Sequence, residues 1–450
     1  MASAQTTETE LIRYPQPVAT GVERPADELP TYEQVTQELE GGFSLPPTDG
    51  GKHAWLLLFA CFMLEGMIWG FGSSYGVFQE YYSTHEPFAG SSNIAVVGAC
   101  AMGIMYMWII PMFVLLKLYP RLRIWAAPVG LTIMCLSLGL GSLATNVTHL
   151  IMSQGIMYAI GGGLAWTPIL FYIEEWWVLR RGFAYGATMA GLGLSGAVLP
   201  IVLQWLLDSY GFRTTLRVCA LSVVALNLPI LFFFKPRLPI SQTTQSRSFD
   251  MTFWKTSSFL IFQSGSILQG LGYFLPTIYL PTFARSLGAS SNQSTATIIL
   301  LNGAACIGSF CMGAAVDRFA VVNCIGLTAL GSTLTVFLLW GFSTSLAPLY
   351  AFCLLYGAFA GSNSSSWSAI MRDTKEKRNG ADTGMIFACL SAGKGVANLC
   401  SGPLSEALLH ADSWRAGFAY GSGFGALIAF TGATALLSGW SYAAKKIGWF

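Results

Sequence analysis

Long apolar segments recur along the chain from His53 to the C-terminus, and short stretches between them hold most of the charged residues. A helix of roughly 20 apolar residues crosses the hydrocarbon core of a bilayer. Backbone polar groups in lipid need partners inside the protein, so segments of this length are predicted to be helices joined by interfacial loops. The predicted spans are 53–78, 93–117, 122–144, 146–172, 182–207, 213–235, 254–284, 293–316, 322–342, 347–370, 381–405 and 413–438.

The composition excludes an ordinary soluble domain. Hydrophobic residues make up 53% of the chain, charged residues 10%, and the mean hydropathy is +0.55. Soluble domains carry about a quarter charged residues, so this chain has too few to build a surface exposed to water. The formal net charge of +2 is spread over many loops, and we therefore expect a lipid bilayer and no nucleic acid as a partner.

The distribution of Lys and Arg predicts the orientation in the membrane. Most of them fall in loops on one side of the twelve predicted spans, and short positively charged loops stay in the cytoplasm. We therefore expect a multi-pass protein of the plasma membrane with both termini in the cytoplasm. Two glycosylation sequons, at Asn146 and Asn292, fall in loops on the opposite side, whereas a third at Asn363 lies inside a span and should stay unmodified.

Charge and polarity also divide the chain. Residues 1–48 are acidic and lack an apolar period, which predicts a disordered cytoplasmic tail and no signal peptide. Polar residues and prolines at 236–252 predict a cytoplasmic linker. The predicted parts are thus the tail, an N-terminal six-helix half at 49–235, the linker, a C-terminal six-helix half at 253–440, and a cytoplasmic C-terminus at 441–450.

The two halves share a weak internal repeat. Gly70-Phe71-Gly72 recurs as Gly270-Leu271-Gly272, and Ala190-Gly191 recurs as Ala392-Gly393 at a similar offset. Duplicated six-helix halves are the architecture of the major facilitator superfamily, in which a central site opens alternately to two sides. Gly313 with Asp317 and Arg318 also resembles that superfamily's loop motif Gly-x-x-x-Asp-Arg. The resemblance implies an all-α membrane protein with 12 transmembrane helices in two pseudo-symmetric halves.

Two further stretches resemble the monocarboxylate transporter family, and its fungal branch in particular. Asp49-Gly50-Gly51 is similar to the motif before that family's first helix, and residues 176–191, with Arg180 and Arg181, keep the spacing of its fifth-helix signature. The Lys, Asp and Arg of its proton-coupled members correspond here to Ser73, Ala305 and Ser309. Proton symport of the lactate type is therefore not implied.

Two ionisable residues are predicted at mid-membrane, where a charge costs about 2.5–3.5 kcal/mol to insert. Glu65 lies near the centre of the first span and Lys394 at a matching depth of the eleventh. We expect them to bind substrate or to couple transport to a proton carried by Glu65. The alternative is a structural ion pair or a hydrogen-bonded buried group.

Polar and aromatic residues also share faces of the other helices that are expected to line the cavity. The candidates for a substrate site are Tyr158 and Trp166, Gln263 and Tyr273, and Asn363 and Trp367. Such a lining suits a planar or amphipathic organic solute, although hydrogen bonding between helices is the favoured explanation for any single residue. Glu174 and Glu175, near Arg180 and Arg181, are expected to form pairs at the cytoplasmic gate or interface, together with Asp317 and Arg318.

The sequence favours a transporter over an enzyme. All ten cysteines lie in apolar segments, so we expect no disulfide, no metal and no cofactor. The four histidines are dispersed, and neither His-Glu-x-x-His nor a nucleotide-binding loop occurs. The predicted function is secondary active or facilitative transport of a small organic solute, a carboxylate or related metabolite, by a monomer. The alternatives are an efflux pump for a fungal secondary metabolite and a solute sensor that does not transport.

Overall fold

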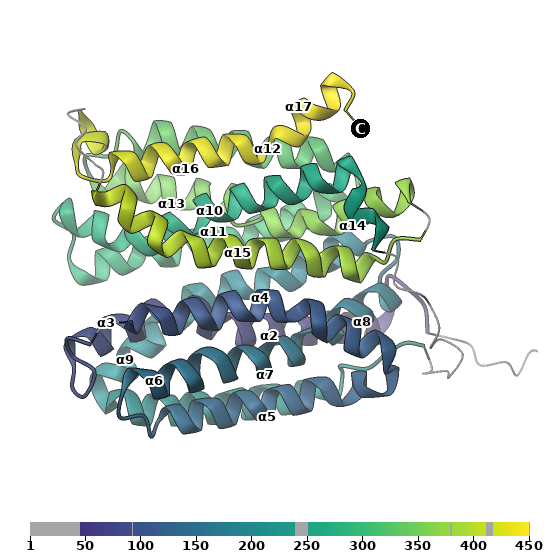
Figure 1. Ribbon diagram of the computed structural model, residues 1–450, viewed down its shortest axis with the longest axis horizontal. Coiled ribbons are helices and arrows are strands. Elements are labelled where there is room, and N and C mark those ends of the chain that lie inside the picture. Colours follow the sequence, from purple (N-terminus) through teal and green to yellow (C-terminus); the bar gives the residue numbers. More distant parts are fainter. Residues whose placement is uncertain (1–45, 92, 239–250, 379, 411–416, 450) are drawn as a thin grey trace, which may run out of the picture. The chain divides into compact units, whose positions relative to one another are not determined.

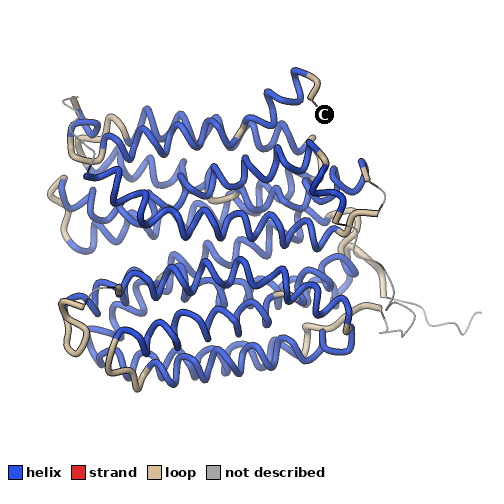
Figure 2. The backbone as a smooth tube through the Cα atoms, in the orientation of Figure 1, coloured by secondary structure: helices blue, strands red, loops and turns tan. Residues whose placement is uncertain are grey.

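The computed structural model describes residues 46–450 except 92, 239–250, 379, 411–416 and 450. Within these residues every regular element is a helix and no strand occurs (Figure 2). Most of the predicted acidic tail and most of the predicted linker lie outside the described residues.

The helices that precede the linker form a first bundle, called the N-bundle here (Figure 1). They are α2 (Gly51–Ser73), α3 (Tyr75–Thr84), α4 (Ile94–Leu118), α5 (Arg123–Gly141), α6 (Val147–Leu150), α7 (Tyr158–Trp166), α8 (Pro168–Trp176) and α9 (Arg181–Leu231), with short helical turns at Pro120–Leu122 and Ile151–Met157.

The helices after the linker form a second bundle, the C-bundle. They are α10 (Ser257–Ser286), α11 (Ser291–Val316), α12 (Val321–Leu334), α13 (Leu346–Ala360), α14 (Trp367–Lys377), α15 (Thr383–His410), α16 (Gly425–Ser438) and α17 (Trp440–Ile447), with helical turns at Thr252–Lys255, Thr335–Trp340, Asn363–Ser366 and Phe418–Gly421.

Eight helical segments of the described residues are long and apolar enough to cross a membrane. They include the segments Gly51–Thr84, Val147–Trp176 and Gly425–Ile447. Three predicted spans are not among the eight. They are the seventh, which contains most of α10, the tenth, which contains most of α13 and the start of α14, and the eleventh, which contains most of α15. These helices carry several of the predicted site residues, among them Gln263, Asn363 and Lys394, and such polar residues lower the mean hydropathy. The count of twelve spans therefore stays a prediction.

The fifth and sixth predicted spans are joined in one element. Helix α9 continues through the residues expected to form a loop, and only Gly211 departs from helical geometry, with φ 73° and ψ 171°. A positive φ is accessible to glycine without steric cost. Gly211 therefore turns the chain sharply between the two spans without a long connection.

Small residues allow the two bundles to approach closely. A Cβ atom on Gly186 of α9 would lie 2.5 Å from the Ser309 oxygen and 2.7 Å from the Gly313 Cα atom of α11. On the other side, a Cβ atom on Gly395 of α15 would lie 2.8 Å from the Tyr106 Cβ atom of α4. Helix pairs α9–α11 and α4–α15 are thus the seams at which the N-bundle meets the C-bundle.

The two ends of the bundles are distinguished by the residues that gather there. At one end, called the linker end, lie the start of α2, the α8–α9 connection, the last turns of α4 and α11 and the start of α15, which contact one another. The opposite end holds the end of α3, the α5–α6 connection and the end of α10.

Candidate functional site

Glu65 lies in the middle of α2 and is 2% exposed. The indole N–H of Trp166, from α7, donates a hydrogen bond to its carboxylate. A buried carboxylate needs such a donor, because an unsatisfied charge in a low-dielectric interior is very costly. Trp166 therefore holds Glu65 in a fixed position on the side of the N-bundle that faces the C-bundle.

Lys394 is the corresponding charge of the C-bundle and is 6% exposed. Its ammonium donates a hydrogen bond of 2.7 Å to the Ser364 hydroxyl. The same nitrogen lies 5.3 Å from the ring centroid of Tyr273 and 5.7 Å from that of Trp367, at cation–π distance. Glu65 and Lys394 are close enough to interact electrostatically. The two predicted charges therefore belong to one site between the bundles.

A series of aromatic rings surrounds these charges. In the N-bundle Trp69 packs against Tyr106, with centroids 4.3 Å apart, and against Trp166 at 6.2 Å. Trp166 in turn stacks on Phe387 of α15 at 5.4 Å. Phe387 also contacts the edge of Trp367, 5.1 Å away. The rings thus run without interruption from one bundle to the other.

The site contains more hydrogen-bond donors than its own acceptors can satisfy. The buried indole N–H groups of Trp69 and Trp367 have no hydrogen-bond partner among the described residues. An ammonium has three N–H donors, and the Ser364 hydroxyl takes one from Lys394. A solute with several oxygen acceptors and a flat apolar body would satisfy these groups.

The remaining predicted residues have mainly structural contacts. The Tyr158 hydroxyl donates to the Ile68 carbonyl at 2.9 Å and thereby links α7 to α2. The Gln263 amide donates to the Cys389 carbonyl at 3.1 Å and links α10 to α15. Tyr273 is half-buried beside Lys394. Of these three, the ring of Tyr273 thus has the most direct contact with a charge of the site.

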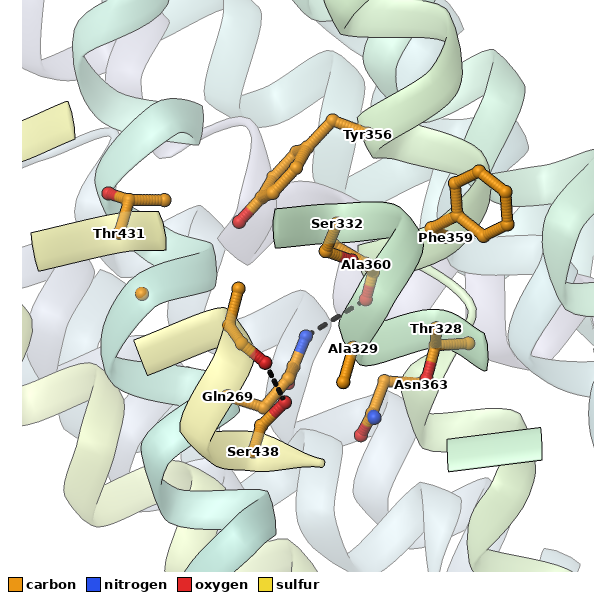
Figure 3. A pocket seen from close by; sticks show the side chains of 12 residues that line it. Gln269, Thr328, Ala329, Ser332, Tyr356, Phe359, Ala360, Asn363, Thr431 and Ser438 are labelled. Atoms are coloured by element: carbon orange, nitrogen blue, oxygen red, sulfur yellow. Dashed lines mark hydrogen bonds between the residues drawn. The ribbon is translucent and has the colours of Figure 1, made fainter. Parts of the chain in front are cut away.

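Asn363 lines small cavities inside the C-bundle (Figure 3). The one drawn there is also lined by Gln269, whose amide donates to the Ala360 carbonyl at 2.9 Å, and by Thr431. The Gln269 side-chain oxygen and the Thr431 hydroxyl have no partner among the described residues. This polar interior belongs to the C-bundle alone, and Asn363 connects it in sequence to Ser364, the partner of Lys394.

The predicted gate residues lie at the linker end with partners that differ from those expected. The Asp317 carboxylate, from α11, accepts hydrogen bonds from the backbone N–H groups of Gly182 and Phe183 at 2.7 and 2.8 Å. These groups lie in the first turn of α9, where the helix dipole also favours a negative charge. Arg318 is exposed. Asp317 therefore joins the C-bundle to the N-bundle directly.

The two glutamates do not form ion pairs with the neighbouring arginines within the described residues. Glu174 accepts a hydrogen bond of 2.6 Å from the Thr383 hydroxyl of α15, which joins the bundles. Glu175 accepts from the backbone N–H of Arg237 at 2.9 Å and lies 4.0 Å from the Arg123 guanidinium. Glu174 thus links the bundles, whereas Glu175 fixes the chain that leaves the N-bundle.

The exposed Arg180 and the half-buried Arg181 are positioned through the backbone. Asp49 accepts hydrogen bonds from the N–H groups of Val178, Leu179 and Arg180 at 2.8–3.0 Å. The two stretches on which the monocarboxylate transporter resemblance rests therefore contact each other. Both predicted glycosylation sites, Asn146 and Asn292, are exposed and lie at the opposite end.

Sequence reasoning missed three residues of the site. Trp69 and Tyr106 lie in segments so uniformly apolar that periodicity does not single out a face. Phe387 lies seven residues before Lys394, which places it on the same face of α15 two turns away. That spacing was available from the sequence, but it points to a site only once Lys394 is known to face the other bundle.

Comparison with known proteins finds similarity to membrane transporters. Residues 264–440 match the family model described as Major Facilitator Superfamily. The matched residues extend from α10 to the start of α17.

Individual relatives are fungal transporters. An MFS-type transporter of Aspergillus niger, pynF, is 29% identical over 380 residues, covering 83% of this chain and 85% of that protein. The Aspyridones efflux protein apdF of Emericella nidulans is 26% identical over 82% of this chain and 74% of its own. The Agnestins efflux protein AgnL12 of Paecilomyces divaricatus is 26% identical over 85% and 89%. The prediction of a transmembrane transporter for a small solute is confirmed at this level.

Proposed function

We propose that this chain exports a small, flat organic metabolite across the plasma membrane by alternating access between two six-helix halves, 49–235 and 253–440. The central observation is that Glu65 and Lys394, one from each bundle, are both buried, interact electrostatically and contact aromatic rings. A solute bound between the bundles contacts both halves, so its release can follow when the halves separate on one side.

Export rather than uptake is supported by the relatives, two of which are named as efflux proteins for fungal products. The contact between Asp49 and the α8–α9 connection supports the monocarboxylate transporter-like subfamily. In this proposal the chain has twelve transmembrane helices, the linker end faces the cytoplasm, and the exposed Asn146 and Asn292 face outward.

Glu65 and Lys394 have separate roles in the proposal. Lys394 attracts acidic or carbonyl oxygens of the solute, and Glu65 binds and releases a proton during the cycle. Protonation of Glu65 leaves the positive charge of Lys394 unbalanced, which strengthens its attraction for an anion. Proton movement and solute binding are thereby coupled through the same site.

The first test is metabolite profiling inside and outside cells with and without the gene. We expect at least one organic metabolite to accumulate inside the cells that lack it. Depletion inside would indicate uptake, and unchanged profiles would contradict transport and favour the sensor alternative.

The second test uses the metabolite so identified in reconstituted vesicles. Glu65→Gln keeps the shape of the side chain but removes the proton site, so the pH dependence of transport should flatten. Lys394→Met should weaken the affinity for an anionic substrate about tenfold or more, whereas Lys394→Arg should retain most of it. If both Glu65→Gln and Lys394→Met transport with the wild-type pH profile and affinity, the two residues are structural.

A further inference from the structure

Phe387 has a position that the transport site alone does not explain. Its ring stacks on two rings of the N-bundle, Trp166 at 5.4 Å and Tyr185 at 5.5 Å, with interplanar angles of 29° and 24°. On its own side it meets the edge of Trp367 at 5.1 Å. All four side chains are at most 2% exposed. Phe387 thus connects the aromatic rings of the N-bundle to Trp367 of the C-bundle, and these four rings are called the ring layer here.

The layer lies between the charged site and the linker end. Helix α15 begins at the linker end, where Thr383 bonds Glu174, and reaches Phe387 after one turn. Lys394 follows seven residues later, roughly 10 Å further along the helix. Trp166, which binds Glu65, is also a member of the layer. A solute that moves between the charged site and the linker end must therefore cross the plane of these rings.

The two sides of this layer differ in chemistry. On the linker side the bundles are held by polar contacts of Asp317, Glu174 and Lys117, which water can replace once the ends separate. Water cannot replace the contacts between stacked rings, because these contacts are stabilised by the removal of apolar surface from water. The ring layer is thus the water-excluding barrier nearest to the site.

We propose that Phe387 is the inner gate of the transport site: its ring seals the site from the linker end while stacked on Trp166 and Tyr185, and it leaves that stack when the site opens there. The inference rests on the proposed alternating access but not on any particular solute.

The experiment measures access to a cysteine one turn deeper than the gate. Ser391→Cys is introduced into a full-length variant without native cysteines, and its reaction with an impermeant methanethiosulfonate reagent is timed in inside-out vesicles and in intact cells. Lys446→Cys, at the linker end, identifies the membrane side on which that end lies. We expect Phe387→Ala to speed labelling from the linker side about tenfold, because two aromatic contacts between the bundles are lost.

Two variants provide controls. Phe387→Tyr retains the ring and should label at the original slow rate. Phe352→Ala removes an equally buried ring that stacks on Trp340 and Tyr356 inside the C-bundle, at 5.2 and 5.0 Å. It should lower the melting temperature without changing access to the reporter. If Phe387→Ala does not fold, Phe387→Leu is measured in its place.

Faster labelling from the linker side alone supports the gate. Unchanged labelling in Phe387→Ala, or equal acceleration from both sides, or equal acceleration in Phe352→Ala, overturns it. The measurement needs no substrate, so a gate that fails this test leaves the metabolite profiles, and with them the proposed export, unaffected.

Discussion

The two ends of the bundles are closed by different kinds of contact. The largest hydrophobic cluster extends through the N-bundle and passes into the C-bundle toward the linker end, where it includes Trp166, Val316 and Phe387. A second cluster, with Phe283 and Trp340, is confined to the C-bundle. The cross-bundle ion pair near this second cluster, Glu80 with Arg285 at 3.3 Å, is about half exposed on both sides.

This difference indicates at which end the contacts between the bundles are more stable. Charge-assisted hydrogen bonds to a buried or half-buried carboxylate contribute more than an exposed ion pair, whose contribution is often near zero. The linker end combines such bonds with ring stacking and close backbone packing. The structure therefore represents a state whose linker end is firmly shut and whose opposite end is only lightly held.

The largest effect is expected from Gly186→Ala. The new methyl group would meet backbone atoms of Ser309 and Gly313, which cannot move aside as a side chain can, and overpacking of this kind costs about 1–3 kcal/mol. We expect faster labelling of Ser391→Cys from the linker side and a lower melting temperature.

Two other glycines of the α9–α11 pair serve as references for that prediction. A Cβ atom on Gly196 would meet the side chain of Asn302, and one on Gly303 would meet nothing within 4 Å. Gly196→Ala should therefore have a smaller effect, and Gly303→Ala should be neutral or slightly stabilising. Equal effects of all three would show that the linker-end seam is not specially tight.

The second effect is expected from Asp317→Asn. The amide keeps one acceptor oxygen but loses the charge and the second hydrogen bond to the first turn of α9. A bond to a charged group contributes about 1.5 kcal/mol at the lower end of its range, and the other bond is kept, so linker-side labelling should rise roughly tenfold.

Asp373→Asn is the matched substitution for Asp317→Asn, because Asp373 pairs with Lys377 within α14 and does not join the bundles. Its labelling rate should equal that of the parent protein. An increase as large as that of Asp317→Asn would assign the effect to surface charge instead of the bond between bundles.

The smallest effect is expected at the opposite end. Glu80→Gln removes the exposed ion pair with Arg285, and we expect labelling of an Asn398→Cys reporter from that side to rise at most about fivefold. High salt should abolish the difference in labelling rate between Glu80→Gln and the parent protein, because the Debye length falls to about 3 Å at 1 M salt. A larger effect that persists in salt would show that the two ends are closed with similar stability.

The sequence predicted the helices well because hydropathy acts locally. It also singled out Glu65 and Lys394 as buried charges, since charges in apolar segments are conspicuous. It could not predict partners that come from distant segments. Lys117, at the end of α4, binds Asp382 of the other bundle at 2.5 Å. Glu174 and Glu175 likewise use partners that only tertiary packing brings near.

The span count shows how polar residues affect the recognition of a membrane helix. Length and apolar content are enough for helices that face lipid or pack into a uniform core. Helices α10, α14 and α15 carry polar residues toward the site, and these lower the signal on which the prediction depends. Polar residues of the proposed site thus weaken the pattern by which their own helices are recognised as membrane spans.

The hydrogen bonds between Asp317 and the start of α9 should leave no trace in the correlated substitutions of related sequences. One partner is a carboxylate and the other is main chain, so Phe183 can change its side chain without loss of the bond. Correlated substitution, which records pairs of side chains that change together, has no second side chain to record here. Asp317 and Phe183 should therefore vary independently among relatives, although they join the two bundles.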